Sequence, residues 1–166
     1  MKHLKIYLAV FILSILTASQ CELAAQTKST LLVGESLGMN DFANGLTSEN
    51  GKYRFSTNTR VLTIINTENN KHVELLNTNS GAKFITEIKV TEGVVTIMTV
   101  EIKDPVNAPN DMGPKEVLAK WGDETKGTKN TKLVMQDDGH LILYAGNAQG
   151  GKGDVLWDSG IPYNIR

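Results

Sequence analysis

The chain has 166 residues, with 17 Lys and Arg against 18 Asp and Glu, which gives a formal net charge of −1. Nucleic-acid-binding domains carry a clustered basic charge that this balance lacks, so we expect no nucleic-acid partner. The length suits one domain behind a targeting segment, and a hydrophobic share of 40% is enough for a buried core.

The N-terminal segment has the layout of a secretory signal peptide. Lys2 and Lys5 precede an apolar run from Ile6 to Leu16, and small residues follow this run. The run is shorter than the roughly 20 apolar residues that span a bilayer. We therefore expect residues 1–25 to be a signal peptide, cleaved between positions 19 and 25. The mature chain would be secreted to the extracellular space, with no membrane span.

Cys21 is the only cysteine, so no disulfide can form within one chain. A lipidation signal places Gly or Ala directly before such a cysteine, whereas Gln20 stands there. Lipid anchoring at Cys21 is therefore kept only as an alternative to free secretion.

The mature chain consists of short β-branched and aliphatic runs separated by Gly, Asn, Asp and Ser, which predict β-strands. These runs include residues 53–55, 61–65, 73–76, 83–90 and 93–102. No segment has the periodicity of a long helix, and residues 114–121 could form two helical turns at most. The Pro-rich segment 104–114 and the Gly-rich segment 145–154 predict surface loops. An all-β sandwich, barrel or prism is expected.

Three similar units follow one another in the mature chain. They comprise residues 55–65 with 73–79, residues 89–97 with 117–119, and residues 136–144 with 155–160. Each unit has a strand pair and then a short apolar strand. A weak threefold repeat is therefore expected.

The most informative segment is 133–144, in which Asp138-Gly139 separates two alternating apolar runs. This pattern predicts a hairpin with the three-residue loop 137–139 and a left-handed conformation at Gly139. Gln136 would then lie opposite His140. The core face would hold Leu133, Met135, Leu141 and Leu143, and the other face Val134, Gln136, His140, Ile142 and Tyr144, with Asp138 at the turn.

The second face combines an amide, a carboxylate, an imidazole, an apolar side chain and a phenol. Sugar hydroxyls both donate and accept hydrogen bonds, so they need partners of these kinds. A charge-assisted bond to Asp138 would be the strongest contact, and Ile142 could pack beneath sugar C–H groups. An ordinary solvated strand face is the alternative interpretation.

The series Gln136-x-Asp138-x-His140-x-Ile142-x-Tyr144 resembles the Gln-x-Asp-x-Asn-x-Val-x-Tyr mannose-binding motif of the bulb-type lectins. Residues 156–160 resemble the Trp-x-Ser strand that follows each site in that family, and residues 50–55 resemble one of its early segments. His140 departs from the motif, because the family has Asn at this position.

The resemblance implies a single bulb-type lectin-like domain over residues 26–166. Its fold would be a type II β-prism of three four-stranded antiparallel sheets with pseudo-threefold symmetry. Its expected partners are mannose-type glycans, and homodimers are common in the family. The implied carbohydrate-binding residues are Gln136, Asp138, His140, Ile142 and Tyr144.

The first two repeats lack the carboxylate and the phenol of the motif. We expect the five corresponding positions to be Ser56, Asn58, Arg60, Leu62 and Ile64 in one repeat, and Lys89, Thr91, Gly93, Val95 and Ile97 in the other. One sugar site at most is then intact. The alternative is a secreted prism scaffold that has lost sugar binding and acts through a protein partner, or as a defence or toxin-like protein.

No catalytic or metal-binding pattern stands out in the mature chain. Its only histidines are His72 and His140, without zinc-ligand spacing. The spacing Gly146-x4-Gly151-Lys152 is that of a phosphate loop, but a strand pattern follows it where a helix is required. We expect no enzymatic activity, no metal and no cofactor. Trp121 and Trp157 are expected to anchor the core.

Overall fold

The computed structural model describes residues 28–79, 81–104 and 107–160. These residues form thirteen β-strands and no helix, which confirms the expected all-β fold. The expected signal peptide and Cys21 lie outside the described ranges. Within those ranges, no helix is long and apolar enough to cross a membrane.

The thirteen strands form three antiparallel sheets, each of which is named here by one of its central strands. The β12 sheet has the order β1 (Thr30–Leu32), β11 (Lys132–Met135), β12 (Leu141–Tyr144), β13 (Val155–Asp158). The β8 sheet has the order β10 (Glu116–Gly122), β8 (Val94–Asp104), β7 (Lys83–Thr91), β2 (Ser36–Gly38), with β9 (Ala108–Met112) also paired to β8. The β5 sheet has the order β3 (Leu46–Thr47), β4 (Tyr53–Thr57), β5 (Val61–Asn66), β6 (His72–Asn77).

All three sheets are assembled in the same way. Each combines a short strand from residues 30–47, a central hairpin and a closing strand. The hairpins and closing strands overlap the three units that the sequence predicts, although strand β11 precedes the third unit, which was expected to begin at residue 136. The short first strand of each sheet is the part that the sequence pattern does not reveal.

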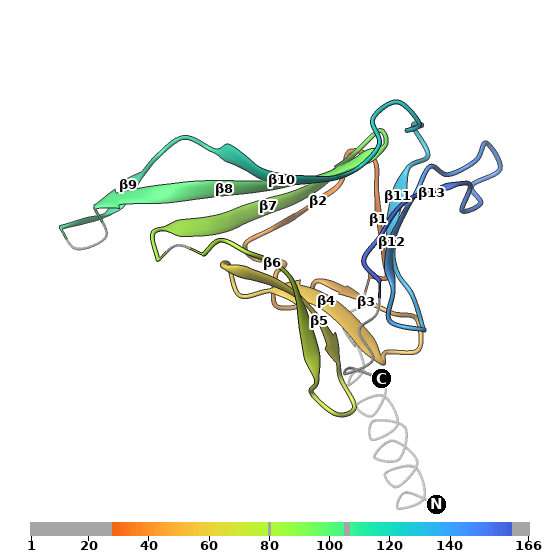
Figure 1. Ribbon diagram of the computed structural model, residues 1–166, viewed down its shortest axis with the longest axis horizontal. Helices are drawn as coiled ribbons and strands as arrows, with labels where there is room; N and C mark the ends of the chain where they lie inside the picture. Colours follow the sequence, from red (N-terminus) through yellow and green to blue (C-terminus); the bar gives the residue numbers. More distant parts are fainter. Residues whose placement is uncertain (1–27, 80, 105–106, 161–166) are drawn as a thin grey trace, which may run out of the picture.

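One hydrophobic core joins the three sheets. Because side chains alternate along a strand, each hairpin turns every second residue inward. Fully buried members include Phe55 and Ile64 of the β5 sheet, Val95 and Ile97 of the β8 sheet, and Leu133 and Leu143 of the β12 sheet. Figure 1 shows the sheets meeting around this core, with the β8 sheet across the top, the β12 sheet on the right and the β5 sheet below.

The two tryptophans connect two closing strands. The rings of Trp121 on β10 and Trp157 on β13 stack with centroids 4.5 Å apart and planes 2° apart. Both side chains are partly buried and pack against the core. They anchor the core as expected, and the stacking of the two rings stabilises the fold beyond the contribution of the area that they bury.

Two expectations for the middle of the chain need correction. The segment considered for a short helix, 114–121, is mainly strand β10, and the expected loop 104–114 contains strand β9. The pairing of β8 with β10 ends at Thr99, so the outer part of β8 needs another partner for its backbone groups. Strand β9 supplies it through the pairs Ile102↔Met112 and Asp104↔Ala108, and the two strands extend away from the core (Figure 1).

The loop that follows β12 depends on a glycine. Gly146 has φ +70°, and a Cβ atom there would lie 1.9 Å from the backbone oxygen of Asn130. We predict that Gly146→Ala lowers the free energy of unfolding by about 2–4 kcal/mol, through overlap and a left-handed backbone. Gly150 has φ +79° with open space around it, so Gly150→Ala should cost about 1 kcal/mol. Urea unfolding of both variants measures the difference, and equal costs would contradict the close approach.

Candidate functional site

The β11–β12 hairpin has the register that the sequence predicts. Met135 pairs with Leu141 and Val134 with Ile142. The Gln136 N–H donates to the His140 carbonyl at 2.9 Å, and the Gly139 N–H donates to the Gln136 carbonyl at 3.0 Å. Gly139 has φ +91°, so the left-handed conformation expected there is confirmed.

The tip of this hairpin is attached to the neighbouring β5 sheet. The Asn50 N–H donates to Asp137 Oδ1 at 2.8 Å, and Asn50 Nδ2 donates to the Asp137 carbonyl at 3.2 Å. A Cβ at Gly139 would lie 2.9 Å from Cε1 of Tyr53, so only glycine fits this approach of the turn to the ring. The loop that carries Asp138 is therefore fixed from two sides.

The two faces of the hairpin differ as expected, but the outer face is more enclosed than a solvated face. The inward residues Leu133, Met135, Leu141 and Leu143 are buried. On the outer face Ile142 is only 7% exposed and Tyr144 only 8% exposed. Gln136 and His140 are half-buried, and Asp138 is exposed. Ile142 therefore offers little surface to a ligand.

The polar side chains of the predicted site are bonded to one another and to β13. Gln136 Nε2 donates to the Tyr144 hydroxyl oxygen. Asp138 Oδ1 accepts a bond from the His140 N–H at 3.1 Å. The ring atom Nδ1 of His140 lies 2.8 Å from Oδ1 of Asp158 on β13. These bonds fix the orientation of each side chain, and they turn His140 toward β13.

Each of these side chains keeps unused hydrogen-bonding capacity. Within the described ranges, no protein group bonds to Gln136 Oε1, Asp138 Oδ2 or His140 Nε2. The Tyr144 hydroxyl accepts from Gln136 and has its own proton left to donate. The cluster thus presents both donors and acceptors to a ligand.

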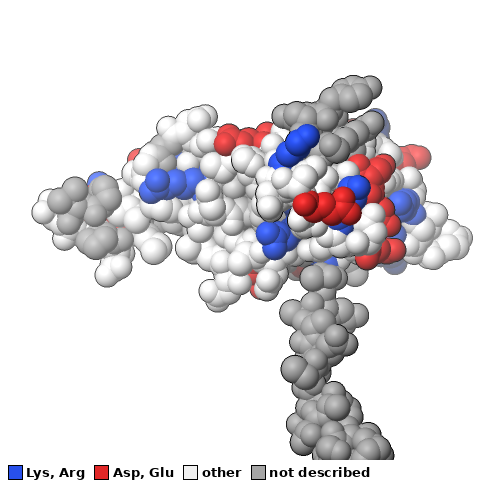
Figure 2. Space-filling view, turned by 90° about the horizontal axis from the view of Figure 1, so that it is seen from below, with Lys and Arg blue, Asp and Glu red and all other residues white. Residues whose placement is uncertain are grey.

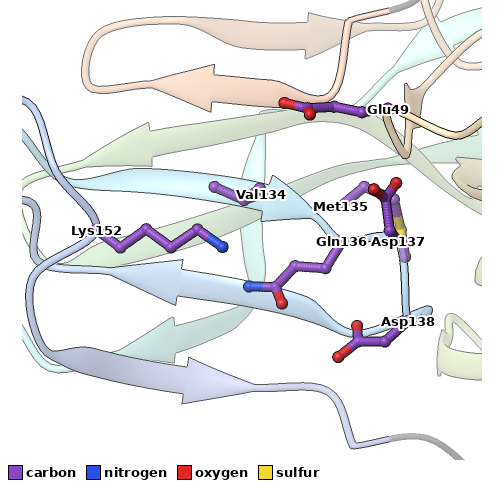
Figure 3. Close-up of a pocket in the computed structure, with 7 residues that line it drawn as sticks. All are labelled: Glu49, Val134, Met135, Gln136, Asp137, Asp138 and Lys152. Carbon is purple, nitrogen blue, oxygen red and sulfur yellow. The ribbon is translucent and has the colours of Figure 1, made fainter.

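An open groove of about 400 Å³ lies beside this cluster (Figure 3). Its lining comprises Glu49, Val134, Met135, Gln136, Asp137, Asp138 and Lys152. Of the five predicted site residues, Gln136 and Asp138 line the groove, whereas His140, Ile142 and Tyr144 do not. The groove is therefore displaced from the predicted site toward Val134 and Lys152.

Sequence reasoning did not assign two charged residues to this groove. Lys152 reaches it from the Gly-rich loop 145–154, and Glu49 reaches it from the turn that joins β3 to β4. The spacing that resembles a phosphate loop did single out Lys152. As expected, strand β13 and not a helix follows that loop. No local sequence pattern indicates Glu49, because Glu49 comes close to Gln136 only through the packing of one sheet against another.

The site positions expected in the first two repeats are wrong in part. Leu62 and Ile64 of the β5 sheet, and Val95 and Ile97 of the β8 sheet, are 0% exposed and belong to the core. The outward positions that correspond to Gln136, His140, Ile142 and Tyr144 are Asn58, Val61, Thr63 and Ile65 in the β5 sheet, and Thr91, Val94, Thr96 and Met98 in the β8 sheet. Neither set includes a phenol or a carboxylate, although the exposed Glu92 stands in the loop of the β7–β8 hairpin.

The physical reason is the length of each hairpin loop. Five residues, 136–140, separate the buried pair Met135 and Leu141. Four residues, 58–61, separate Thr57 from Leu62, and four, 91–94, separate Val90 from Val95. A difference of one residue reverses the face on which every later side chain lies.

A smaller hollow of about 270 Å³ lies over the β5 sheet, next to Asn58, Thr63 and His72.

The surface charges do not form a large field of one sign on the face seen in Figure 2. Basic and acidic side chains lie next to each other there. Among the described residues, no group of three or more His, Cys, Asp or Glu side chains is arranged to hold a metal ion.

No family model, curated protein or solved structure matches this chain. The assignment of its function therefore depends on the motif and on the geometry of the β12 sheet.

The contact between Asn50 and Asp137 provides a test of how the site is supported. We predict that Asp137→Ala lowers the free energy of unfolding by about 1 kcal/mol, because it removes an acceptor of the Asn50 N–H. Hydrogen exchange at the Asn50 amide should become faster. Asp154→Ala removes an exposed carboxylate from the same sheet region and should leave that amide protected. Unchanged exchange in Asp137→Ala would contradict this contact.

Proposed function

We propose that this chain is a carbohydrate-binding protein that takes mannose-type glycans on the outer face of the β12 sheet. The observation that carries the proposal is the convergence of Gln136, Asp138 and Tyr144 on one hairpin, with hydrogen-bonding capacity left over on each. A sugar ring has several hydroxyls that both donate and accept, and such a mixed set satisfies them. His140 contributes its free Nε2.

The groove suggests how the ring is placed. Asp138 Oδ2 and Gln136 Oε1 would accept hydrogen bonds from hydroxyls, and the carboxylate would form the stronger bond. Val134 lines the groove, whereas Ile142 is nearly covered. Val134 is therefore the better apolar surface for the C–H groups of the ring.

The proposal includes the architecture and location typical of bulb-type lectins. The common strand order of the three sheets supports a β-prism with pseudo-threefold symmetry. Residues 1–25 would direct secretion, and the domain would act outside the cell without enzymatic activity. A single open site should bind one sugar at about millimolar Kd, because its hydroxyls exchange water for protein partners with little net gain. Homodimers would raise the avidity.

A second function is favoured by two specific observations. The contact of His140 with Asp158 occupies one ring nitrogen, and in the other two sheets no phenol stands at the position that corresponds to Tyr144. A secreted scaffold that has lost sugar binding, and that acts through a protein partner or as a defence or toxin-like protein, would have these features. The two functions are distinguished by whether any glycan competes with the protein partner for binding. A scaffold that has lost sugar binding would show no such competition.

The decisive experiment is a glycan array with the mature chain and its Asp138→Ala variant. Wild type should bind mannose-terminated glycans, and the variant should lose at least tenfold in affinity, which corresponds to about 1.4 kcal/mol for the charge-assisted bond. Because Asp138 is exposed, the variant should remain folded in a thermal unfolding measurement.

Asp111→Ala is the matched control, because Asp111 is an exposed carboxylate on β9 in another sheet. It should bind like wild type. Full affinity of Asp138→Ala would refute the site assignment. A blank array with folded wild-type protein would favour the scaffold function.

A further inference from the structure

The loop that joins β12 to β13 brings a lysine back over the sheet. The Gly146 N–H donates to the Lys152 carbonyl at 3.0 Å, and Lys132 Nζ donates to the Gly150 carbonyl at 2.6 Å. These bonds fold the Gly-rich loop onto the strands. The position of Lys152 thus follows from bonds at several points of the loop.

The ammonium group of Lys152 is directed into the groove of the proposed sugar site. Its Nζ lies 5.4 Å from the ring centroid of Tyr144, within the range of a cation–π attraction. Figure 3 shows the side chain extended along the sheet, with the ammonium group pointing toward the Gln136 amide. Among the described residues, Lys152 is the one lysine that lines this groove.

The charge of Lys152 is not matched by a carboxylate of any residue that the structure describes. Ion pairs occupy six other lysines, which are Lys28, Lys52, Lys83, Lys115, Lys120 and Lys126. Within the described part of the chain, no carboxylate lies within ion-pair distance of Lys152. The ammonium group is therefore available to a ligand.

The two ends of the groove carry charges of opposite sign. Lys152 lies at one end, and Glu49, Asp137 and Asp138 lie toward the other (Figure 3). A ligand with a negative group would be attracted at the lysine end and repelled at the carboxylate end. Repulsion of the reversed orientation gives specificity beyond the attraction itself.

We propose that the groove prefers a sugar that carries an anionic group, a carboxylate or a phosphate ester, and that Lys152 receives this group while Gln136 and Asp138 bind the hydroxyls. This inference rests on the proposed sugar binding. It makes Lys152 the residue that determines specificity between acidic and neutral hexoses. An exposed lysine and an anion attract each other modestly, so we expect a roughly threefold to tenfold preference.

The test measures the Kd of mannose, mannuronate and mannose 6-phosphate by NMR titration of the mature chain at low salt. Wild type should bind the two acidic sugars more tightly, and 0.5 M NaCl should remove most of the difference. Lys152→Met should bring the ratio of acidic to neutral affinity to one or below, because the groove then keeps only its carboxylates, and Lys152→Arg should retain the wild-type ratio. Lys103→Met, which removes an exposed lysine on β8, should keep the wild-type ratio.

The outcomes separate the two proposals. Binding of mannose by wild type without any preference for the acidic sugars would overturn this inference and leave the proposed function standing. A preference that persists in Lys152→Met would also overturn it. Absence of binding for all three sugars, with folded protein, would overturn the proposed function and this inference together.

Discussion

The hydrophobic core shared by the three sheets constrains every other part of the molecule. Each hairpin must turn alternate residues into it, so the register of each strand pair is fixed by burial. Only the outward residues and the loops can then change in sequence without disturbing the core. The β11–β12 hairpin uses this freedom differently from the other two, because its loop is one residue longer. With that residue, the spacing between the buried pair places Gln136, His140, Ile142 and Tyr144 on the outer face.

The contacts inside the site have two opposite effects on a ligand. The bonds from Gln136 to Tyr144 and from His140 to Asp158 hold the side chains in place, so less conformational entropy is lost on binding. The same bonds use donors and acceptors that a ligand would otherwise engage. What remains is a small set of free atoms next to an open groove, an arrangement suited to weak and reversible recognition.

The sequence was sufficient wherever the pattern was local. Asp138-Gly139 between alternating apolar runs predicts the β11–β12 hairpin, its loop and both of its faces correctly. The same spacing applied to the other repeats assigned Leu62 and Val95 to the outer face, because hairpin loop length is not visible in an apolar pattern. Strand β9 was missed because its Pro and Asn residues are typical of loops. The groove itself depends on Glu49, which contacts the region only through packing between sheets.

The strand order also has a consequence for how the chain folds. Strand β1 precedes every other described strand, yet its partner β11 lies about a hundred positions further along the chain. Strand β2 likewise cannot pair until its partner β7, which lies later in the chain, has been synthesised. Only the β5 sheet can close from neighbouring residues, so it is the natural starting point of folding. The β12 sheet is then completed last, and nascent chains would expose unpaired strand edges until almost the whole domain has been made.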